Sequence, residues 1–392
     1  MERRRVAITG LGVVAPCGIG ADAYWRGLLG PAPEGERRIY DFVADDWFDS
    51  PKDARRTDRF AQFAVAAAAM AMEQAGVLGV NPTRAGVILG TGVGGLNTLE
   101  EQILVYHQKD PRRVSPFLVP MMMANAGSAA LSMRYGFQGP CSTTVTACAA
   151  GTHALGDAAR QIRDGRCDVM LAGGSEASMT PVAIQGFINM TAASKTGICR
   201  PFDRDRDGLV MAEAAAVFVL EELGHARARG ARILGEILGS ANNADAYHIT
   251  APSPGGGGAV ACMELALADA ELRSEDIRHI NAHGTSTPLN DAAEAEAVNK
   301  VFGNHCPPMT STKGITGHAL GAAGAIEAAA VLLAMEHRLI PPTAGTKTID
   351  PEMPAIDLVL GEPRAWEPGP CLSNSFGFGG HNGSLVLAPP PA

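Results

Sequence analysis

The sequence predicts an α/β fold built from two similar halves, and three observations support this expectation. Short apolar runs typical of buried strands alternate along the chain with segments of helical periodicity. A β-branched stretch at 143–146 passes directly into a helical pattern. After the glycine run at 255–258 the alternation of helix and strand begins again. We therefore expect one unit at 1–240 and another at 241–392, although no repeat is visible as residue identity.

The expected elements follow from these apolar patterns. In the first unit we expect strands at 6–12, 86–90, 143–146, 168–173 and 214–221, and helices at 20–30, 57–75, 96–108, 121–135, 147–165 and 222–229. A strand at 232–240 is expected to pair with the strand at 214–221. In the second unit we expect helices at 259–270, 291–302 and 318–335 and a strand at 279–282. The stretches 31–57 and 190–208 are polar and turn-rich, which is typical of loops, and the first of them is expected to include some helix.

Composition excludes several classes of protein. The chain has 392 residues, of which 46% are hydrophobic, so it can bury a large core. Its net charge of −9 argues against a nucleic-acid binder, and an acidic partner would need a local basic patch. The eight cysteines form no C-x-x-C pair or zinc-finger spacing, so we expect reduced thiols and neither a metal site nor disulfides. The N-terminus shows no signal or membrane segment, so we expect a cytoplasmic protein without membrane partners.

Three glycine-rich or acidic motifs are weak matches. Gly10-Leu-Gly12-Val-Val-Ala15 imitates a dinucleotide fingerprint, but Pro16 interrupts it where a helix should begin. The glycine loop at 91–95 lacks the Lys-Ser/Thr ending of a phosphate loop, so tight packing is its expected role. The alternating aspartates at 203–207 lack the glutamate that closes a calcium loop.

Cys148 is the candidate nucleophile, because it stands where the 143–146 strand turns into a helix. The free N–H groups and the dipole at a helix N-terminus favour negative charge, so we expect the pKa of this thiol to be lowered. The flanking alanines and glycine leave room for a second molecule at the sulfur. A buried structural thiol is the alternative interpretation.

Two histidines of the second unit lie among small residues. His283 follows the strand at 279–282, and His318 lies at the start of the helix expected at 318–335, at the kind of position where α/β folds place ligands. A lone histidine in such a place is usually structural, and two of them favour a shared site. Lys313 and Glu327 flank His318 on an apolar segment, so they should be paired if they are buried. Phe378 lies between glycines, where it can be a core residue or a mobile one.

Four blocks carry a resemblance to a known family: Thr-Ala-Cys148-Ala-Ala-Gly, Asn-Ala-His283-Gly-Thr-Ser-Thr, Thr-Lys313-Gly-Ile-Thr-Gly-His318 and Asn-Ser-Phe-Gly-Phe378-Gly-Gly. In this order and spacing the chain resembles the elongating β-ketoacyl-[acyl-carrier-protein] synthases, especially the type II form, over nearly its whole length. The resemblance implies the thiolase fold, in which two pseudo-symmetric halves, each with a mixed five-stranded sheet, form five α-β-α-β-α layers. It also implies a dimer.

The same resemblance implies a catalytic role for each residue. Cys148 would accept an acyl chain as a thioester, which divides the formation of a carbon–carbon bond into two steps. His283 and His318 would bind a malonyl thioester and stabilise the enolate formed when carbon dioxide leaves. Lys313 and Glu327 would support the charges around His318. Phe378 would act as the gate, and the backbone N–H groups of Phe378 and Cys148 would hold the oxyanion. No metal or other cofactor is implied.

Substrate and partner residues are implied as well. Thr285 and Thr287 would contact the phosphopantetheine arm, and Val93 and Phe187 would line the acyl pocket. Leu118 stands where the bacterial fatty-acid enzyme has a phenylalanine contributed across the dimer, so a longer or reshaped pocket is a hypothesis. The basic positions that would meet an acidic carrier protein, rather than being only a solvated surface, are Arg112, Arg113, Arg55 and Arg56. The implied partners are acyl- and malonyl-loaded carrier proteins and a second subunit, either identical or a chain-length factor.

Two departures from the family pattern leave the pathway open. The usual Gly-Gly-Thr-Asn-Gly reads Gly-Gly-His381-Asn-Gly here, and the usual Thr-Lys-Ser reads Thr-Lys-Gly314. Two functions therefore remain possible: an enzyme of fatty acid elongation, or a ketosynthase subunit of a dissociated type II polyketide synthase. A thiolase would carry a second cysteine in the C-terminal glycine loop, and a starter-unit synthase would pair one histidine with asparagine. A non-catalytic chain-length partner would lack Cys148, and a nicotinamide oxidoreductase is the weakest option.

Overall fold

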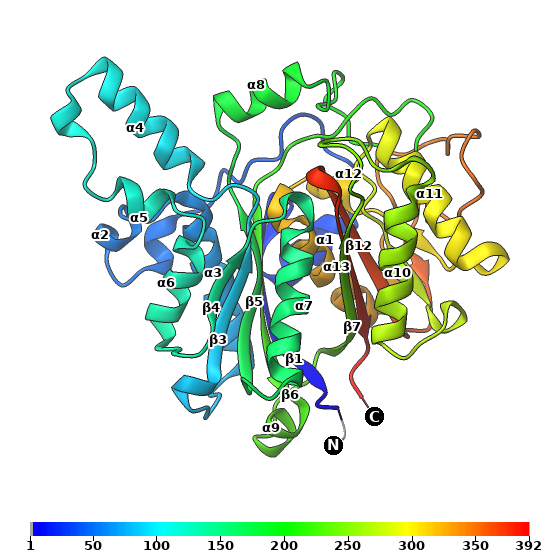
Figure 1. Cartoon of the computed structure of the whole chain (residues 1–392), viewed down its shortest axis with the longest axis horizontal. Helices are drawn as coiled ribbons and strands as arrows, with labels where there is room; N and C mark the ends of the chain where they lie inside the picture. Colours follow the sequence, from blue (N-terminus) through cyan, green and yellow to red (C-terminus); the bar gives the residue numbers. More distant parts are fainter. Residues whose placement is uncertain (1–2, 392) are drawn as a thin grey trace.

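The computed structural model describes residues 3–391 and arranges them in layers of helix and sheet (Figure 1). The main strands form one path in the order β4-β3-β5-β6-β1-β7-β13-β12-β8-β9. Their bounds are β1 Val6–Ala15, β3 Ala85–Gly90, β4 Cys141–Thr144, β5 Val169–Glu176, β6 Ala214–Glu222, β7 Gly235–Ala244, β8 His279–Asn281, β9 Met309–Thr310, β12 Cys371–Gly377 and β13 His381–Ala388. A short strand, β2 (Gly18–Ile19), pairs with β1, and β10 (Leu339–Ile340) pairs with β11 (Arg364–Ala365).

The strand path consists of two sets with the same pairing pattern. In the first set β3 is parallel to β4 and β5, and β6 and β1 follow antiparallel. In the second set β8 is parallel to β9 and β12, and β13 and β7 follow antiparallel. The two sets meet where β1 pairs antiparallel with β7, from Val6↔Ile237 to Ile8↔Gly235. Two mixed five-stranded sets with the same pairing pattern, joined at their edges by β1 and β7, confirm the expected fold class.

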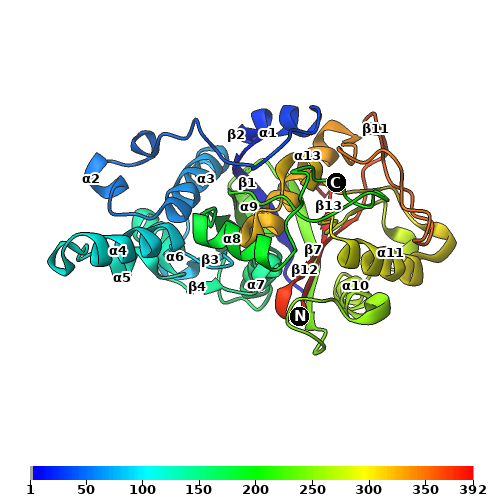
Figure 2. The same cartoon turned by 90° about the horizontal axis from the view of Figure 1, so that it is seen from above.

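Helices cover and separate the two sets. Figure 2 shows α7 (Ala150–Arg163) and α13 (Ala323–His337) between α3 (Arg59–Ala75) and α6 (Ala126–Tyr135) on one side and α10 (Gly257–Asp269) and α11 (Pro288–Phe302) on the other. The helix α7 contacts β3 and β5 of the first set and β7 and β13 of the second, and α13 contacts strands of both sets as well. Nearly every residue of α13 is buried, which its many alanines allow at close range.

The segment Leu320–His337 is apolar and long enough to cross a membrane by length and composition alone. In the structure 89% of it is buried among the other elements. It is therefore the core helix of this fold.

The remaining helices are α1 Ala21–Leu28, α2 Pro51–Ala54, α4 Leu96–Gln108, α5 Leu118–Met122, α8 Pro181–Asn189, α9 Leu223–Ala228 and α12 Lys313–Thr316. Three expectations were wrong. The helix expected at 318–335 begins only at Ala323, as α13, after a separate turn at Leu320–Ala322, so His318 lies before the helix and not at its start. The expected helix at 121–135 is interrupted, because α5 ends at Met122 and α6 begins at Ala126. The strands expected at 214–221 and 232–240 do not pair with each other, because β1 lies between β6 and β7. The boundary predicted after residue 240 falls inside β7 and stays a prediction.

The weak sequence motifs have structural explanations. Gly10 and Gly12 lie inside β1 rather than in a loop. A Cβ atom on Gly10 would lie 2.1 Å from the carbonyl oxygen of Ala71, and one on Gly12 would lie 1.9 Å from that of Ala67. These glycines therefore let α3 pack closely on β1. Asp203 accepts hydrogen bonds from backbone N–H groups, including that of Lys347 at 2.7 Å, as a carboxylate that organises a turn does.

Candidate active site

Cys148 lies in a tight turn between β4 and α7. A single 3₁₀ turn, Ala147–Ala149, precedes α7, and Ala147 has a φ of 48°, which non-glycine residues rarely adopt. The strained residue therefore stands directly before the candidate nucleophile, as is common at functional sites. The side chain of Cys148 is only 6% exposed and belongs to an apolar cluster that includes Met179 and Leu320.

The expected lowering of the Cys148 pKa is wrong. Burial raises the pKa of this thiol to about 11, although the nearby Lys313 ammonium and the backbone N–H of Phe378 act in the opposite direction. Apolar surroundings disfavour the thiolate more than the helix N-terminus favours it. The resting nucleophile at neutral pH is therefore a thiol, and its proton must be taken up by another group.

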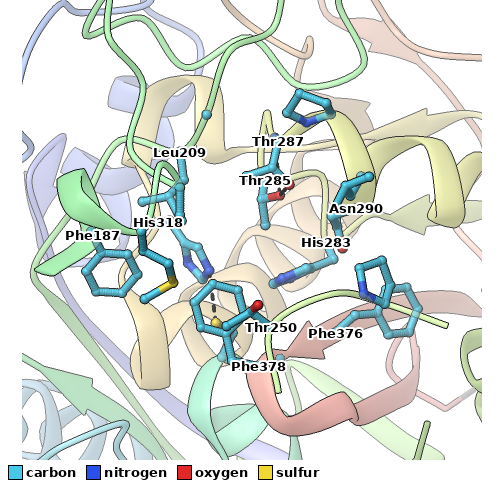
Figure 3. A pocket seen from close by; sticks show the side chains of 18 of the residues that line it. Phe187, Leu209, Thr250, His283, Thr285, Thr287, Asn290, His318, Phe376 and Phe378 are labelled. Atoms are coloured by element: carbon cyan, nitrogen blue, oxygen red, sulfur yellow. Dashed lines mark hydrogen bonds between the residues drawn. The ribbon is translucent and has the colours of Figure 1, made fainter. Parts of the chain in front are cut away.

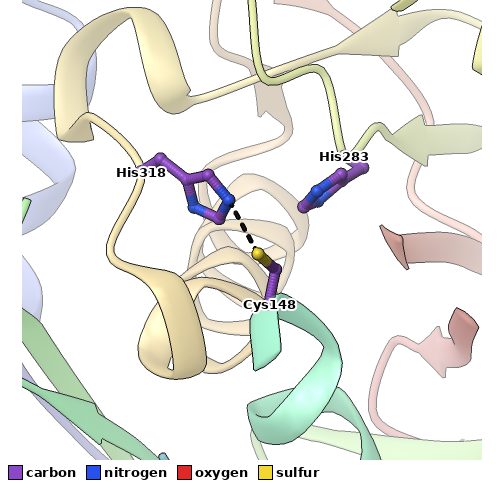
Figure 4. A group of neighbouring side chains, drawn as sticks. All are labelled: Cys148, His283 and His318. Atoms are coloured by element: carbon purple, nitrogen blue, oxygen red, sulfur yellow. Dashed lines mark hydrogen bonds between the residues drawn. The ribbon is translucent and has the colours of Figure 1, made fainter. Parts of the chain in front are cut away.

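The structure brings His283 and His318 to Cys148 (Figure 4). The His318 Nε2 atom lies 3.1 Å from the sulfur, so the thiol can donate its proton to this nitrogen. The two imidazole rings are 5.3 Å apart and nearly perpendicular. One donor atom from each of the three residues lies within 4.8 Å of the other two. The three residues thus face one point, although they come from distant parts of the sequence.

A buried ion pair stands behind the histidines. The Lys313 ammonium pairs with the Glu327 carboxylate, and both side chains are fully buried. The ammonium also donates to the His283 backbone carbonyl at 2.5 Å and lies 3.3 Å from His283 Nδ1. Because an ammonium can only donate, Nδ1 must be the acceptor and the proton of His283 must sit on Nε2. The two charges are paired, as expected for buried groups.

Both histidines are neutral at physiological pH. Burial, reinforced by the Lys313 charge, lowers the pKa values of His283 and His318 well below their usual value. Burial raises the pKa of Glu327 to about 7, with Lys313 opposing that rise. A neutral imidazole with Nε2–H is suited to donate a hydrogen bond to a developing oxyanion.

Two carboxylates that sequence analysis missed fix the loop of His283. Glu294 accepts hydrogen bonds of 2.8 Å from the N–H groups of both His283 and Gly284. Asp291 accepts from the N–H groups of Thr285 at 3.0 Å and Ser286 at 3.1 Å. The only available signal was their spacing, since residues three apart on α11 lie on one helix face.

The cysteine and both histidines line a cavity of about 310 Å³ (Figure 3). Thr285 and Thr287 line it as well, and their hydroxyls are 2.9 Å apart. Phe187 and Phe378 stack on each other in its wall with ring centres 6.3 Å apart. Most of the surface of the cavity wall is apolar, which suits a long, weakly polar ligand.

The segment next to Phe378 is fixed by hydrogen bonds of Asn382. Asn382, which sequence analysis did not single out, donates through Nδ2 to Asp245 at 2.8 Å and to Asn243 at 2.9 Å. The ring of His381 lies close to Gly379, where an added Cβ would be 3.0 Å from it. Gly379 has a φ of 81°, which a glycine adopts without strain.

Two predicted pocket residues lie outside this cavity. Val93 is 47% exposed, Leu118 begins α5 and is half-buried, and neither lines the cavity. Their assignment to the acyl pocket stays a prediction.

The four predicted docking arginines are exposed: Arg55, Arg56, Arg112 and Arg113. The guanidinium of Arg56 lies 4.2 Å from the centre of the Phe117 ring, which joins the segment of α2 to that preceding α5. Arg112 forms an ion pair of 2.9 Å with Asp110. Figure 1 shows α2, which directly precedes Arg55 and Arg56, and the projecting α4, which precedes Arg112 and Arg113, on the same side of the molecule.

The donor set of Cys148, His283 and His318 consists of residue types that bind zinc. The Lys313 ammonium beside His283 Nδ1 places a positive charge against this cluster. The absence of a catalytic metal stays a prediction from the sequence. All eight cysteines are free thiols in the structure.

Comparisons with known proteins agree with this geometry. The family model described as "Beta-ketoacyl synthase, N-terminal domain" matches residues 36–226, and that described as "Beta-ketoacyl synthase, C-terminal domain" matches residues 234–347. The chain is 44% identical to a 3-oxoacyl-[acyl-carrier-protein] synthase 2 of Synechocystis sp., covering 99% of this chain and 98% of that protein. It is 42% identical to the protein of the same name from Coxiella burnetii, covering 99% of both.

Solved structures are similar over the full length. The ishigamide ketosynthase/chain length factor superposes with a TM-score of 0.93 at 34% identity and covers 100% of both chains. A type II polyketide ketosynthase in complex with its acyl-carrier protein superposes with a TM-score of 0.88 at 32% identity, also covering 100% of both. With both family models matched in chain order and relatives above 40% identity across almost the whole length, the chain belongs to the β-ketoacyl synthase family of acyltransferases.

Proposed function

We propose that this protein is a β-ketoacyl-[acyl-carrier-protein] synthase that extends an acyl chain held as a thioester on Cys148. The reaction is a decarboxylative Claisen condensation with a malonyl unit on a carrier protein. The observation that carries this proposal is the meeting of Cys148, His283 and His318 in one cavity, with donor atoms within 4.8 Å. The names of the relatives, 3-oxoacyl-[acyl-carrier-protein] synthase 2, support the same reaction.

In the first half-reaction, the thiol of Cys148 attacks the carbonyl carbon of an acyl thioester. His318 Nε2, at 3.1 Å, takes the thiol proton and passes it to the departing phosphopantetheine thiolate. The oxyanion of the tetrahedral intermediate lies near the N–H groups of Cys148 and Phe378, since the Phe378 N–H already points to the sulfur. One carbon–sulfur bond forms and one breaks, and no proton is lost overall.

In the second half-reaction, the malonyl thioester loses carbon dioxide and the electrons of the broken bond pass to the thioester oxygen. The Nε2–H of His283 donates to this enolate oxygen, and Lys313 holds the imidazole in the required tautomer. Because His318 Nε2 accepts the thiol proton in the first half-reaction, His318 can donate to the enolate only after its ring proton moves from Nδ1 to Nε2. Its Nδ1 has no hydrogen-bond partner among residues 3–391 that would hold the proton there. The enolate carbon attacks the acyl carbonyl on Cys148, and collapse of the tetrahedral intermediate releases the sulfur as a thiolate. The thiolate takes up one proton from solvent, which balances the overall reaction.

The partners and the setting are also part of the proposal. The exposed Arg112 and Arg113, with Arg55 and Arg56, would bind the acidic carrier protein. A second subunit would cover the exposed apolar side chains Val93, Val119 and Met133 and bring Leu118 to the acyl pocket. Eight free thiols are suited to the reducing cytoplasm.

A ketosynthase subunit of a type II polyketide synthase is the second candidate. It is favoured by His381, which lies against the gate glycine Gly379 where the fatty-acid enzymes have threonine. Similar solved structures include ketosynthases described with a chain length factor. Analysis of the products made with and without such a partner would separate the two functions. A 3-oxoacyl chain that is bound to the carrier protein and longer by one added unit indicates fatty acid elongation.

Mass spectrometry of the intact protein after incubation with acyl carrier proteins tests the function. We expect the wild type to gain one acyl mass, Cys148→Ala to gain none, and Cys141→Ala, which removes an exposed thiol, to gain the full mass. His283→Ala should be acylated normally, while its condensation rate falls by about 10²–10³-fold because one oxyanion donor is lost. Acylation of Cys148→Ala would show that the sulfur is not the nucleophile.

A further inference from the structure

Glu176, the last residue of β5, is a buried carboxylate that the proposed chemistry does not use. Burial raises its pKa to about 7, with its hydrogen bonds opposing that rise. Its Oε2 atom accepts from the N–H of Gly92 at 2.5 Å and from the N–H of Gly321 at 3.2 Å. Its Oε1 atom accepts from the hydroxyl of Ser178. A carboxylate is costly to bury, so this position indicates that the bonds it makes are needed.

These donors, together with the Thr91 hydroxyl at 3.5 Å from Oε2, belong to three different segments. Gly92 lies in the loop after β3, Gly321 lies three residues after His318, and Ser178 lies between β5 and α8. The segments meet without spare room, because a Cβ on Gly92 would be 2.7 Å from Glu176 Oε2 and one on Gly321 would be 2.1 Å from the Gly92 nitrogen. One carboxylate thus binds all three segments through hydrogen bonds.

Two of these segments carry the apolar wall around the nucleophile. Met179 follows Ser178, and Leu320 precedes Gly321, and both pack in the apolar cluster that contains Cys148. The carbonyl end of an acyl chain bonded to the sulfur therefore begins beside this cluster. Displacement of Met179 or Leu320 therefore changes the space open to the chain.

We propose that Glu176 is a positioning residue for acyl-chain selection, which acts by fixing the segments of Met179 and Leu320 through hydrogen bonds to Ser178 and Gly321. The inference rests on the proposed function, since it concerns the chain that Cys148 accepts. Glu176 itself touches neither the substrate nor the reacting atoms.

The test compares Glu176→Leu with Glu176→Gln. Cys148 acylation is measured with butanoyl- and dodecanoyl-carrier protein, and the ratio of the two kcat/KM values is the readout. Leucine accepts no hydrogen bond, so we expect this ratio to change by about tenfold or more, the effect of a small change in an apolar pocket. Glutamine keeps a carbonyl oxygen for both N–H groups, so its ratio should stay within about threefold of the wild type.

Glu221→Gln is the matched control, because Glu221 is a buried carboxylate of β6 that bonds Thr9 and Arg229. It should lower the Tm without changing the selectivity ratio. If Glu176→Leu does not fold, Ser178→Ala is the test variant. It removes only the hydrogen bond between Ser178 and Glu176, and it should shift the ratio of the two kcat/KM values by about threefold. The inference is overturned if the folded test variant, Glu176→Leu or Ser178→Ala, has the same selectivity ratio as the wild type. A wild-type protein that gains no acyl mass on Cys148 overturns the proposed function instead.

Discussion

Replacing Lys313 with methionine removes a buried cation that contacts both His283 and Glu327. Methionine fills most of the volume and loses all three donors. The Nδ1 of His283 is then no longer held as an acceptor, so the tautomer that presents a lone pair instead of Nε2–H to the substrate becomes available. The loss of one oxyanion donor lowers a rate by about 10²–10³-fold, so we expect condensation to fall by this factor.

Stability changes as well, with a pH dependence. Removing one partner of a buried ion pair costs about 3–5 kcal/mol, unless the remaining group becomes neutral. The folded pKa of Glu327 is already raised from 4.5 to about 7, and the loss of Lys313 raises it further. Above pH 4.5 the unfolded state loses the Glu327 proton, whereas the folded variant keeps it until the pH exceeds its raised pKa. The free energy of unfolding of the variant therefore falls as the pH rises from 4.5 toward and past 7.

The double variant Lys313→Met/Glu327→Leu separates the two effects. An apolar pair of similar volume is close to neutral for stability, so its Tm should approach that of the wild type while condensation stays low. Acylation is measured by intact mass, condensation by product formation, and Tm at pH 6 and pH 8. If Lys313→Met condenses within about threefold of the wild type while Cys148 acylates normally, Lys313 does not set the tautomer of His283.

Three further predictions concern other parts of the molecule. Because burial raises the pKa of Cys148 to about 11, the rate of its alkylation by iodoacetamide should rise about tenfold per pH unit from about pH 7 to 9.5. The Cys148→Ala variant gives the background rate from the other thiols. A rate that stops rising below pH 9 would contradict the prediction. Changing Arg112 and Arg113 to glutamate should raise the KM for the carrier protein, most strongly at low salt. The control Arg232→Glu, which changes another exposed arginine in an ion pair, should leave this KM unchanged. A KM of the Arg112/Arg113 variant equal to that of the wild type would exclude these arginines as the docking site. Gly314→Ser should lower the Tm, because its Cβ would lie 1.9 Å from the Ala344 carbonyl oxygen, and an unchanged Tm would show that the loop yields.

The sequence predicted much of the fold because its signals are local. The apolar alternation located most strands and helices, and α4 has the bounds that were expected. The pairing of β6 and β7 with β1 was not visible, because register and strand order depend on contacts between distant segments. The break before α6 was missed for a similar reason, since the apolar pattern runs through it.

The same division applies to the site. Cys148, His283 and His318 stand in recognisable blocks, and they meet in the structure. Glu294 acts on the backbone of His283 through a fold-dependent contact that no motif marks. The direction of the Cys148 pKa was wrong because the helix terminus is readable from the chain, whereas the desolvation by surrounding apolar side chains is known only after folding.

The placing of α7 and α13 in the middle layer has a consequence for how the protein can be made. Each helix is covered by strands from both sets, so a fragment ending near β7 would leave a bare, alanine-rich surface facing water. Separately produced fragments should therefore aggregate alone and become soluble only when produced together. The Cys148 sulfur comes from one fragment, and the His283 and His318 imidazoles come from the other. Condensation activity would therefore appear only when the two fragments assemble.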